Sequence, residues 1–262
     1  MMKTNFQLLT GFYFLLFLTI LSCSKDEEPA QRTVLDIEND FAAIEVKPGT
    51  QDLTLKITDD ITYNFRVIFP DVDLSNKWPM VLTLHGYSAG DPDAHKYTDC
   101  YVEPGLAALD VIIISPNGGE ADWEVISNQN MLQILTDLSS RFWPVDVSKI
   151  VVTGYSNGGN GSWYYAETQP AIFSASIPLA AGYAIVNPDG SARKVDIPMY
   201  VIHGEEDDLF PLDTVQNWVD QSISVGSDIE FVVAEGLGHY TPCDYISYFQ
   251  DAAVWLENEV WQ

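Results

Sequence analysis

The chain has 262 residues, of which 47% are hydrophobic and 12% aromatic, so it can bury one large core. Its 38 acidic residues outnumber 12 Lys and Arg residues, which gives a formal net charge of −26 at pH 7. A surface this acidic repels nucleic acid, anionic lipid headgroups and polyacidic glycans, so it favours neutral or weakly charged substrates and excludes nucleic acid as a partner. The sequence carries no signal for an oligomeric state.

The N-terminus has the pattern of an export signal. Lys3 precedes a largely apolar stretch over residues 6–21, which Thr10 and Gly11 interrupt. One positive charge before an apolar core too short for a lasting membrane span predicts a secretory signal peptide over residues 1–22. The end of this stretch, Ile20-Leu21-Ser22-Cys23, resembles a bacterial lipobox and implies cleavage before Cys23 with a lipid anchor on its thiol. The alternative is an ordinary cleaved signal followed by an incidental cysteine.

Residues 24–28, Ser-Lys-Asp-Glu-Glu, resemble the export tag of Gram-negative bacteria that display glycan-degrading lipoproteins. The resemblance implies a lipid-anchored protein of the bacterial outer membrane, exposed at the cell surface, with the anchor as its only membrane contact. The other interpretation is a charged, solvated tether. We expect residues 23–48 to be the tether and a lead-in, and residues 49–262 to form a single domain.

Short apolar runs recur along this domain. Residues 53–57 and 63–69 flank a polar turn and predict an antiparallel hairpin. Six later runs are continuously apolar, as expected of parallel strands that are buried on both faces: 80–84, 111–114, 150–153, 177–179, 199–202 and 231–233. Segments with apolar residues at helical spacing lie between or after them: 128–142, 214–225 and 245–260. This alternation predicts the α/β class, with helices on both faces of a mostly parallel sheet.

Connection lengths limit the shape of the pocket. Only a short segment separates Gly182 from the strand near Pro198, too little for a large helical cap, so we expect an open, loop-lined pocket. Trp123 lies in another long connection, over residues 117–128. It is a candidate to stack on a sugar or an aromatic acyl group, with packing in the core as the alternative.

The most informative motif is Gly154-Tyr155-Ser156-Asn157-Gly158, directly after the run at 150–153. A strand that ends in a tight turn and enters a helix exposes the hydroxyl of Ser156, and glycines are needed where a Cβ would meet neighbouring backbone. Later strands are followed by an acid and by a histidine, so the chain order is Ser, Asp, His. The histidine is His239, and the acid candidates are Asp207, Asp208, Glu206 and Glu205.

This constellation has a clear chemical reason. A serine hydroxyl is a weak nucleophile until a neutral imidazole, here His239, removes its proton, and a buried carboxylate must orient that imidazole. The backbone N–H groups of Tyr87 and Asn157 are candidates for an oxyanion hole, with Ser88 as an alternative to Tyr87. The chemistry needs no cofactor. The histidines and cysteines lack the close spacings of zinc sites, so no metal site is predicted.

Residues 50–262 resemble the α/β-hydrolase superfamily and, within it, the secreted feruloyl, acetylxylan and polyhydroxyalkanoate-type esterases. The segments that carry the resemblance are the elbow at 146–159 and His203-Gly204, followed by Asp207 and Pro211. The resemblance implies an α/β-hydrolase fold without a large cap domain and assigns the acid to Asp207, with Asp208 as its nearest rival. It also implies a serine esterase that forms an acyl-enzyme and removes acetyl or feruloyl groups from a polysaccharide or its fragments. The chain departs from these relatives at residues 163–165, Trp-Tyr-Tyr, where small residues are usual.

Two other functions remain open. A serine peptidase of the prolyl-oligopeptidase type would use the same three residues, although such enzymes usually carry a large N-terminal propeller, for which the stretch before Leu53 is too short. A glycan-binding lipoprotein could keep the fold without turnover. Cys100 and Cys243 pair in a disulfide if the chain folds outside the cytosol, and two unpaired buried thiols are the alternative.

Overall fold

The computed structural model describes residues 32–262. The predicted signal peptide, Cys23 and the tether up to residue 31 lie outside the described residues. Within residues 32–262, no helix is both long enough and apolar enough to cross a membrane.

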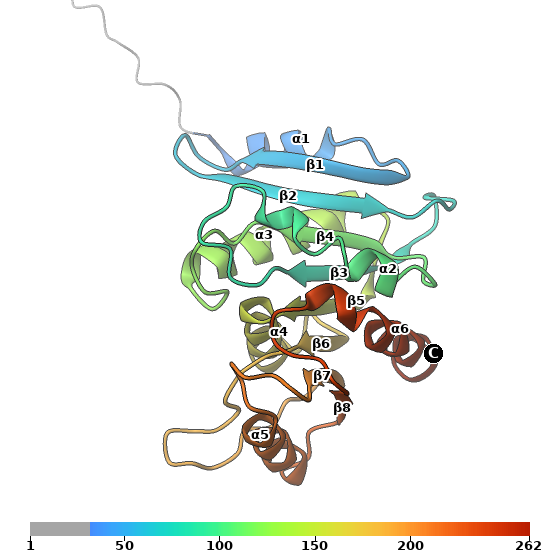
Figure 1. The fold of residues 1–262 in the computed structure, drawn as a ribbon. Coiled ribbons are helices and arrows are strands. Elements are labelled where there is room, and N and C mark those ends of the chain that lie inside the picture. The colour runs from blue at the N-terminus through green and yellow to red at the C-terminus, as the bar shows by residue number, and fades with distance from the viewer. Residues whose placement is uncertain (1–31) are drawn as a thin grey trace, which may run out of the picture. The chain divides into compact units, whose positions relative to one another are not determined.

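Eight strands form one sheet in the order β1-β2-β4-β3-β5-β6-β7-β8 (Figure 1). The predicted hairpin is present at its edge, where β1 and β2 pair antiparallel, and β2 also pairs antiparallel with β4. All pairs from β4 to β8 are parallel. The strands are β1 (Gly49–Lys56), β2 (Thr62–Phe69), β3 (Trp78–Leu84), β4 (Ile112–Pro116), β5 (Val145–Tyr155), β6 (Ala175–Leu179), β7 (Met199–Gly204) and β8 (Ile229–Ala234). The predicted α/β class with a mostly parallel sheet is confirmed.

Helices cover both faces of this sheet. One face packs against α1 (Val34–Ala42), α3 (Ile126–Phe142), α4 (Asn157–Thr168) and α5 (Leu212–Ser224), and the other against α2 (Val102–Gly105) and α6 (Ile246–Trp255). Three short helices complete the chain: η1 (Ala94–Lys96), η2 (Pro242–Tyr245) and η3 (Leu256–Val260). The helices predicted over 128–142 and 214–225 are confirmed, whereas the segment 245–260 divides into the end of η2, α6 and η3.

Helix α1 and strand β5 also differ from the prediction. Helix α1 lies in the segment expected as a lead-in, begins with a capping box between Thr33 and Asp36, and buries Phe41 completely. The ring of Phe41 stacks on that of Trp143 at a centroid distance of 4.6 Å, so this part of the lead-in packs on the domain. Strand β5 begins at Val145, five residues before the predicted start. Its first half carries the polar residues Asp146 and Ser148, so it lacks the continuous apolar run by which the strand was predicted.

Candidate active site

Ser156 occupies a strained turn between β5 and α4. Its φ and ψ are 56° and −118°, a conformation that L-residues rarely adopt, and its N–H donates to the carbonyl of Leu179 at 3.0 Å. A Cβ at Gly158 would lie 1.9 Å from the Leu84 oxygen, and one at Gly154 would lie 2.3 Å from the Gly158 oxygen. Both glycines are therefore required for helix α4 to approach the sheet closely enough to form this turn.

The structure brings Ser156, His239 and Asp207 into one hydrogen-bonded chain. Ser156 Oγ lies 2.9 Å from His239 Nε2, and His239 Nδ1 lies 2.8 Å from Asp207 Oδ2. Because an ionised carboxylate only accepts hydrogen bonds, His239 carries its proton on Nδ1 and leaves Nε2 free to accept the hydroxyl proton of Ser156. His239 and Asp207 are only 3% and 4% exposed, which keeps this chain of contacts away from bulk solvent.

Asp207 is held more firmly than the other acids of its loop. Its Oδ1 accepts the N–H groups of Leu209 at 3.0 Å and Phe210 at 2.8 Å, while Oδ2 faces His239. The rival candidates Asp208, Glu206 and Glu205 are exposed, and Glu205 accepts instead from the N–H of Gly236 at 2.9 Å. Among the four acids, the geometry therefore selects Asp207 as the partner of His239.

A close approach of two loops fixes the distance between this acid and the histidine. A Cβ at Gly204 would lie 2.4 Å from the Leu237 oxygen and 2.3 Å from the hydroxyl of Tyr245. The N–H of Glu206 donates to the same Leu237 oxygen at 2.9 Å, and the Tyr245 hydroxyl donates to the carbonyl of Gly238 at 3.1 Å. Glycine is therefore needed at position 204 to let the two loops meet.

His85 orients the loop that carries Tyr87. Its Nε2 accepts the N–H of Gly118 at 3.0 Å, so the ring proton sits on Nδ1, which donates to the Gly86 carbonyl at 2.6 Å. Burial lowers the pKa of His85 and keeps the ring neutral. The Gly86–Tyr87 peptide is trans, so its C=O and N–H bonds point in opposite directions. Because the Gly86 carbonyl is held by His85 Nδ1, the direction of the Tyr87 N–H, away from that ring, is fixed as well.

The second predicted oxyanion donor lies at the start of α4. Asn157 is the first residue of that helix, where the N–H has no partner within the helix and the helix dipole favours negative charge. Gly86 lies next to this turn, since a Cβ built on it would be 3.6 Å from the Cβ of Ser156. The alternative donor residue, Ser88, directs its hydroxyl to the carbonyl of Gly119 at 2.7 Å.

Trp123 does not contact the pocket, so the interpretation as a stacking platform is wrong. Its side chain is fully buried in the core. Its indole N–H donates to the His85 carbonyl at 2.9 Å, and its own carbonyl accepts the hydroxyl of Tyr165 at 2.6 Å. Trp123 therefore braces the loop of His85, and Tyr165, in the segment that departs from the family pattern, supports it from α4.

A cavity of about 400 Å³ opens beside Ser156. Half of the described residues that line it are tyrosines, and none of them is Lys, Arg, Asp or Glu: Gly86, Tyr87, Tyr97, Tyr101, Tyr155, Ser156, Leu209, His239, Tyr240 and Pro242. Tyr87 and Tyr240 are 65% and 73% exposed, so aromatic rings stand at the mouth. Six lining residues could not be recognised from the sequence, apart from the position of Tyr240 directly after His239: Tyr97, Tyr101, Tyr155, Leu209, Tyr240 and Pro242.

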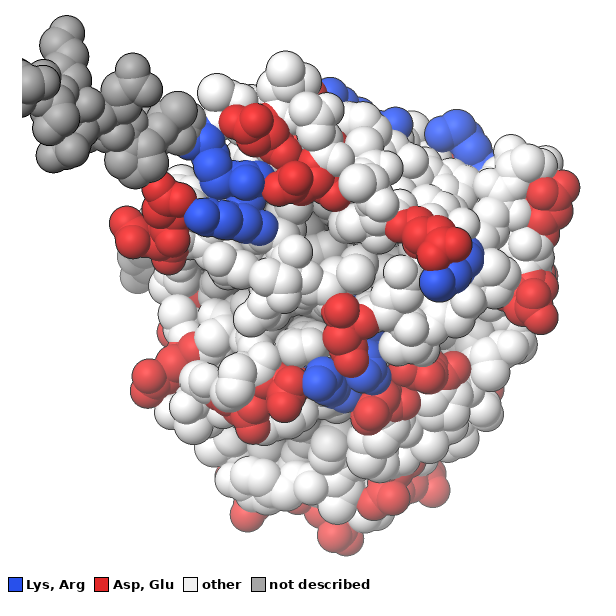
Figure 2. All heavy atoms as spheres, turned by 90° about the horizontal axis from the view of Figure 1, so that it is seen from above, with Lys and Arg blue, Asp and Glu red and all other residues white. Residues whose placement is uncertain are grey.

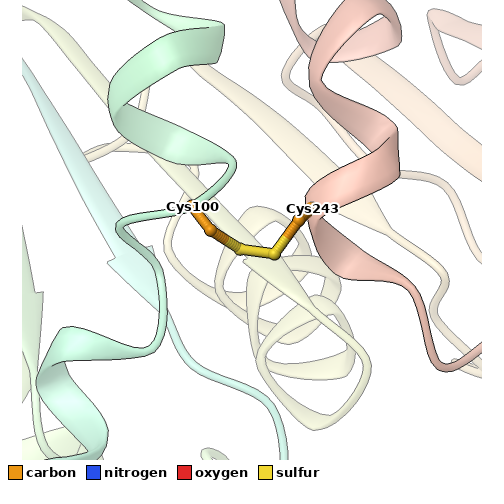
Figure 3. Close-up of a disulfide and its surroundings, with 2 residues drawn as sticks. All are labelled: Cys100 and Cys243. Carbon is orange, nitrogen blue, oxygen red and sulfur yellow. A yellow bond between two sulfur atoms is a disulfide. The ribbon is translucent and has the colours of Figure 1, made fainter.

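A disulfide joins Cys100 to Cys243, with their Cα atoms 5.2 Å apart (Figure 3). Each cysteine is next to a residue that lines the cavity, Tyr101 on one side and Pro242 on the other. The bond therefore connects two walls of the pocket that come from distant parts of the chain.

The charges of the described residues do not gather into a basic surface. Ion pairs join Arg66 to Asp52 at 2.8 Å and Lys96 to Asp93 at 2.7 Å, and Figure 2 shows basic side chains beside acidic ones on the face that it presents. Among residues 32–262, no group of three or more His, Cys, Asp or Glu side chains could hold a metal ion.

The dienelactone hydrolase family model matches residues 118–257, which include Ser156, Asp207 and His239. A candidate carboxymethylenebutenolidase of Methylorubrum extorquens is 24% identical over 134 residues, 47% of this chain and 46% of the relative. The chain spans about half the length of the curated relatives it matches.

Two solved structures share the fold. A fluorophosphonate-binding serine hydrolase of Staphylococcus aureus has a TM-score of 0.66 at 16% identity, covering 81% of this chain and 100% of its own. Esterase 2 of Thermogutta terrifontis has a TM-score of 0.63 at 16% identity, covering 81% and 95%. Together with the family match over more than half of its length, these findings show that the chain has the α/β-hydrolase fold and belongs to the dienelactone hydrolase family.

Proposed function

We propose that this chain is a serine carboxylic ester hydrolase in which Ser156, His239 and Asp207 form a catalytic triad. The observation that carries the proposal is the pair of hydrogen bonds from Ser156 Oγ to His239 Nε2 and from His239 Nδ1 to Asp207 Oδ2, at 2.9 and 2.8 Å. Both distances are in the range needed for proton transfer and for fixing the imidazole tautomer.

Acylation starts when Ser156 Oγ attacks the ester carbonyl carbon and its proton passes to His239 Nε2. The negative charge on the former carbonyl oxygen is stabilised by the N–H groups of Tyr87 and Asn157, each contributing about 3 kcal/mol in comparable sites. When the C–O bond to the alcohol breaks, the alcohol oxygen takes the proton from Nε2 and an acyl-enzyme remains.

Deacylation repeats these steps with water. A water molecule gives a proton to His239 Nε2 as its oxygen attacks the acyl carbon. The bond to Ser156 Oγ then breaks, the proton returns to the serine, and the carboxylic acid leaves. Throughout, Asp207 stabilises the imidazolium and does not itself take up a proton.

The substrate that we propose is an acetyl or feruloyl ester borne on a polysaccharide or its fragments. Two features of the cavity support a neutral and bulky ester: its mouth carries the exposed rings of Tyr87 and Tyr240, and none of the residues within 32–262 that line it is Lys, Arg, Asp or Glu. Aromatic rings offer flat faces to sugars and to aryl groups, whereas a buried unpaired charge on the substrate would be costly.

We also propose that the protein is exported and anchored through Cys23 to the outer membrane at the cell surface. The disulfide between Cys100 and Cys243 supports folding in an oxidising compartment. Exchange of Cys23 for serine is expected to release the protein from the membrane fraction, and unchanged fractionation would reject the anchor.

Hydrolysis by the wild type and Ser156→Ala tests the catalytic proposal. We expect the wild type to cleave p-nitrophenyl acetate, methyl ferulate and acetylated xylan, and Ser156→Ala to lose the activity by about 10⁴-fold or more. Ala-Pro-type amides are measured in parallel, because preferred cleavage of the amide would favour a peptidase. Equal, negligible rates of wild type and variant on every ester would reject the enzymatic proposal and favour a binding function.

A further inference from the structure

His203 lies next to the proposed triad, although the mechanism does not use it. It is the fifth residue of β7, its side chain is fully buried, and its Nε2 lies 2.7 Å from the carbonyl oxygen of Phe210. Since a carbonyl oxygen only accepts, Nε2 carries the ring proton. Nε2 is 3.8 Å from Asp207 Oδ2, which is too far for a hydrogen bond, so the hydrogen-bonded link from His203 to the carboxylate runs through Phe210.

Phe210 contacts each of the groups that must stay aligned. Its N–H donates to Asp207 Oδ1 at 2.8 Å, while its carbonyl is held by His203. Its ring meets the ring of His239 edge-on, with centroids 5.1 Å apart and an interplanar angle of 83°. The Phe210 ring packs directly against Gly182, where a Cβ would lie only 2.3 Å from the ring.

A buried histidine at position 203 carries a cost that an apolar residue would not. Within residues 32–262 the Nδ1 atom of His203 has no hydrogen-bond partner, and an unsatisfied buried polar atom destabilises the fold. Burial also lowers the pKa of this ring, which stays neutral and keeps Nε2–H as a permanent donor. The cost of the unpaired nitrogen is understandable if the donated hydrogen bond is needed for function.

We infer that His203 is a positioning residue for ester hydrolysis: its hydrogen bond to the Phe210 carbonyl fixes Phe210, which in turn aligns Asp207 and His239. The inference rests on the proposed triad. It adds a fourth side chain to the site, and that side chain touches neither substrate nor any reacting atom. Loss of its hydrogen bond would let residues 207–210 move relative to β7, and displacements of about an ångström in a catalytic group cost up to about 10²-fold in rate.

The test compares two substitutions of His203 in the full chain. His203→Leu removes the donor, whereas His203→Gln places an amide N–H near the position of Nε2. With p-nitrophenyl acetate we expect His203→Leu to lower kcat by about 10- to 100-fold while KM stays within about twofold, because the residue does not line the cavity. We expect His203→Gln to retain most of the wild-type kcat.

An NMR measurement distinguishes a misaligned His239–Asp207 pair from a general loss of stability. The downfield proton resonance of His239 Nδ1–H, which bridges to Asp207, is expected to shift or broaden in His203→Leu and to persist in His203→Gln. Val201→Ala is the matched control, since Val201 is buried on the same face of β7 two residues away. It is expected to lower the melting temperature without changing kcat or this resonance below the transition.

His203→Asn is the second variant if His203→Leu does not fold, because its shorter amide does not reach the Phe210 carbonyl and should give the same loss of kcat. The inference is overturned if the variant lacking the donor keeps kcat within twofold of wild type, or if His203→Gln loses as much activity as that variant. Failure of the triad itself is distinguishable, because Ser156→Ala would then remain active whatever happens at position 203.

Discussion

The contacts of Asp207 predict that replacing it with asparagine traps the wrong tautomer of His239. Oδ1 accepts two backbone N–H groups, from Leu209 at 3.0 Å and Phe210 at 2.8 Å, so an amide nitrogen cannot take that position. The asparagine oxygen must therefore replace Oδ1, and its NH₂ group must face His239 Nδ1. Nδ1 then has to accept, the ring proton moves to Nε2, and Nε2 can no longer receive the proton of Ser156.

The size of this effect follows from the mechanism. In a comparable triad the same exchange leaves the geometry intact and lowers kcat about 10⁴-fold, which corresponds to about 5.5 kcal/mol of transition-state stabilisation. We expect the same order for Asp207→Asn with p-nitrophenyl acetate, at unchanged melting temperature. Asp208→Asn is the control, since Asp208 is exposed and is expected to stay within twofold of wild type.

An Asp207→Asn variant that kept more than a tenth of the wild-type kcat would contradict the predicted change of tautomer. A larger loss in Asp208→Asn than in Asp207→Asn would refute it as well, and would transfer the role to the neighbouring acid.

Three further predictions follow from the geometry. Gly158→Ala should prevent formation of the elbow, because its Cβ would lie 1.9 Å from the Leu84 oxygen; soluble protein with wild-type kcat would contradict this. Burial lowers the pKa of His85 and His203 below the ordinary 6.5, so the unfolded chain binds protons that the folded chain does not. The free energy of unfolding should therefore decrease as the pH falls below about 6.5, by up to about 1.4 kcal/mol per pH unit for each ring, and urea denaturation at pH 7 and 5.5 measures it. Because no described residue that lines the cavity is Lys or Arg, kcat/KM for a monoanionic ester should be at least about tenfold lower than kcat/KM for a neutral ester of equal length. Leu209→Lys should bring the two values of kcat/KM closer together.

Much of the fold could be predicted because its signals are local. The parallel strands are short and continuously apolar, since both of their faces are covered, and the elbow glycines stand where any Cβ would meet backbone. Helix α1 was missed because its exposed side carries Val34 and Leu35, which obscure the helical stripe that ends in the buried Phe41. The start of β5 was missed because Asp146 and Ser148, which hydrogen-bond to each other, interrupt the apolar run by which the strand was predicted.

The site was predictable only in part, for a related reason. The order of Ser156, Asp207 and His239 along the chain reflects strand ends that a parallel sheet must bring to one edge. The walls of the cavity depend on how distant loops pack, and no local pattern reports that. Trp123 illustrates the limit, since a tryptophan in a long connection looks the same in sequence whether its ring is exposed or, as here, fully buried.

The disulfide has a consequence for the order in which the molecule is built. Cys100 and Cys243 are 143 residues apart, and Cys243 follows the last strand of the sheet. During synthesis the pocket wall that contains Cys100 is made long before the wall that contains Cys243. The disulfide can therefore join the two walls only after all eight strands have been made. A chain interrupted before residue 243 could still form most of the sheet, yet its first wall would have no second wall to bind, so the two walls of the pocket can be joined only when little beyond α6 and η3 remains to be made.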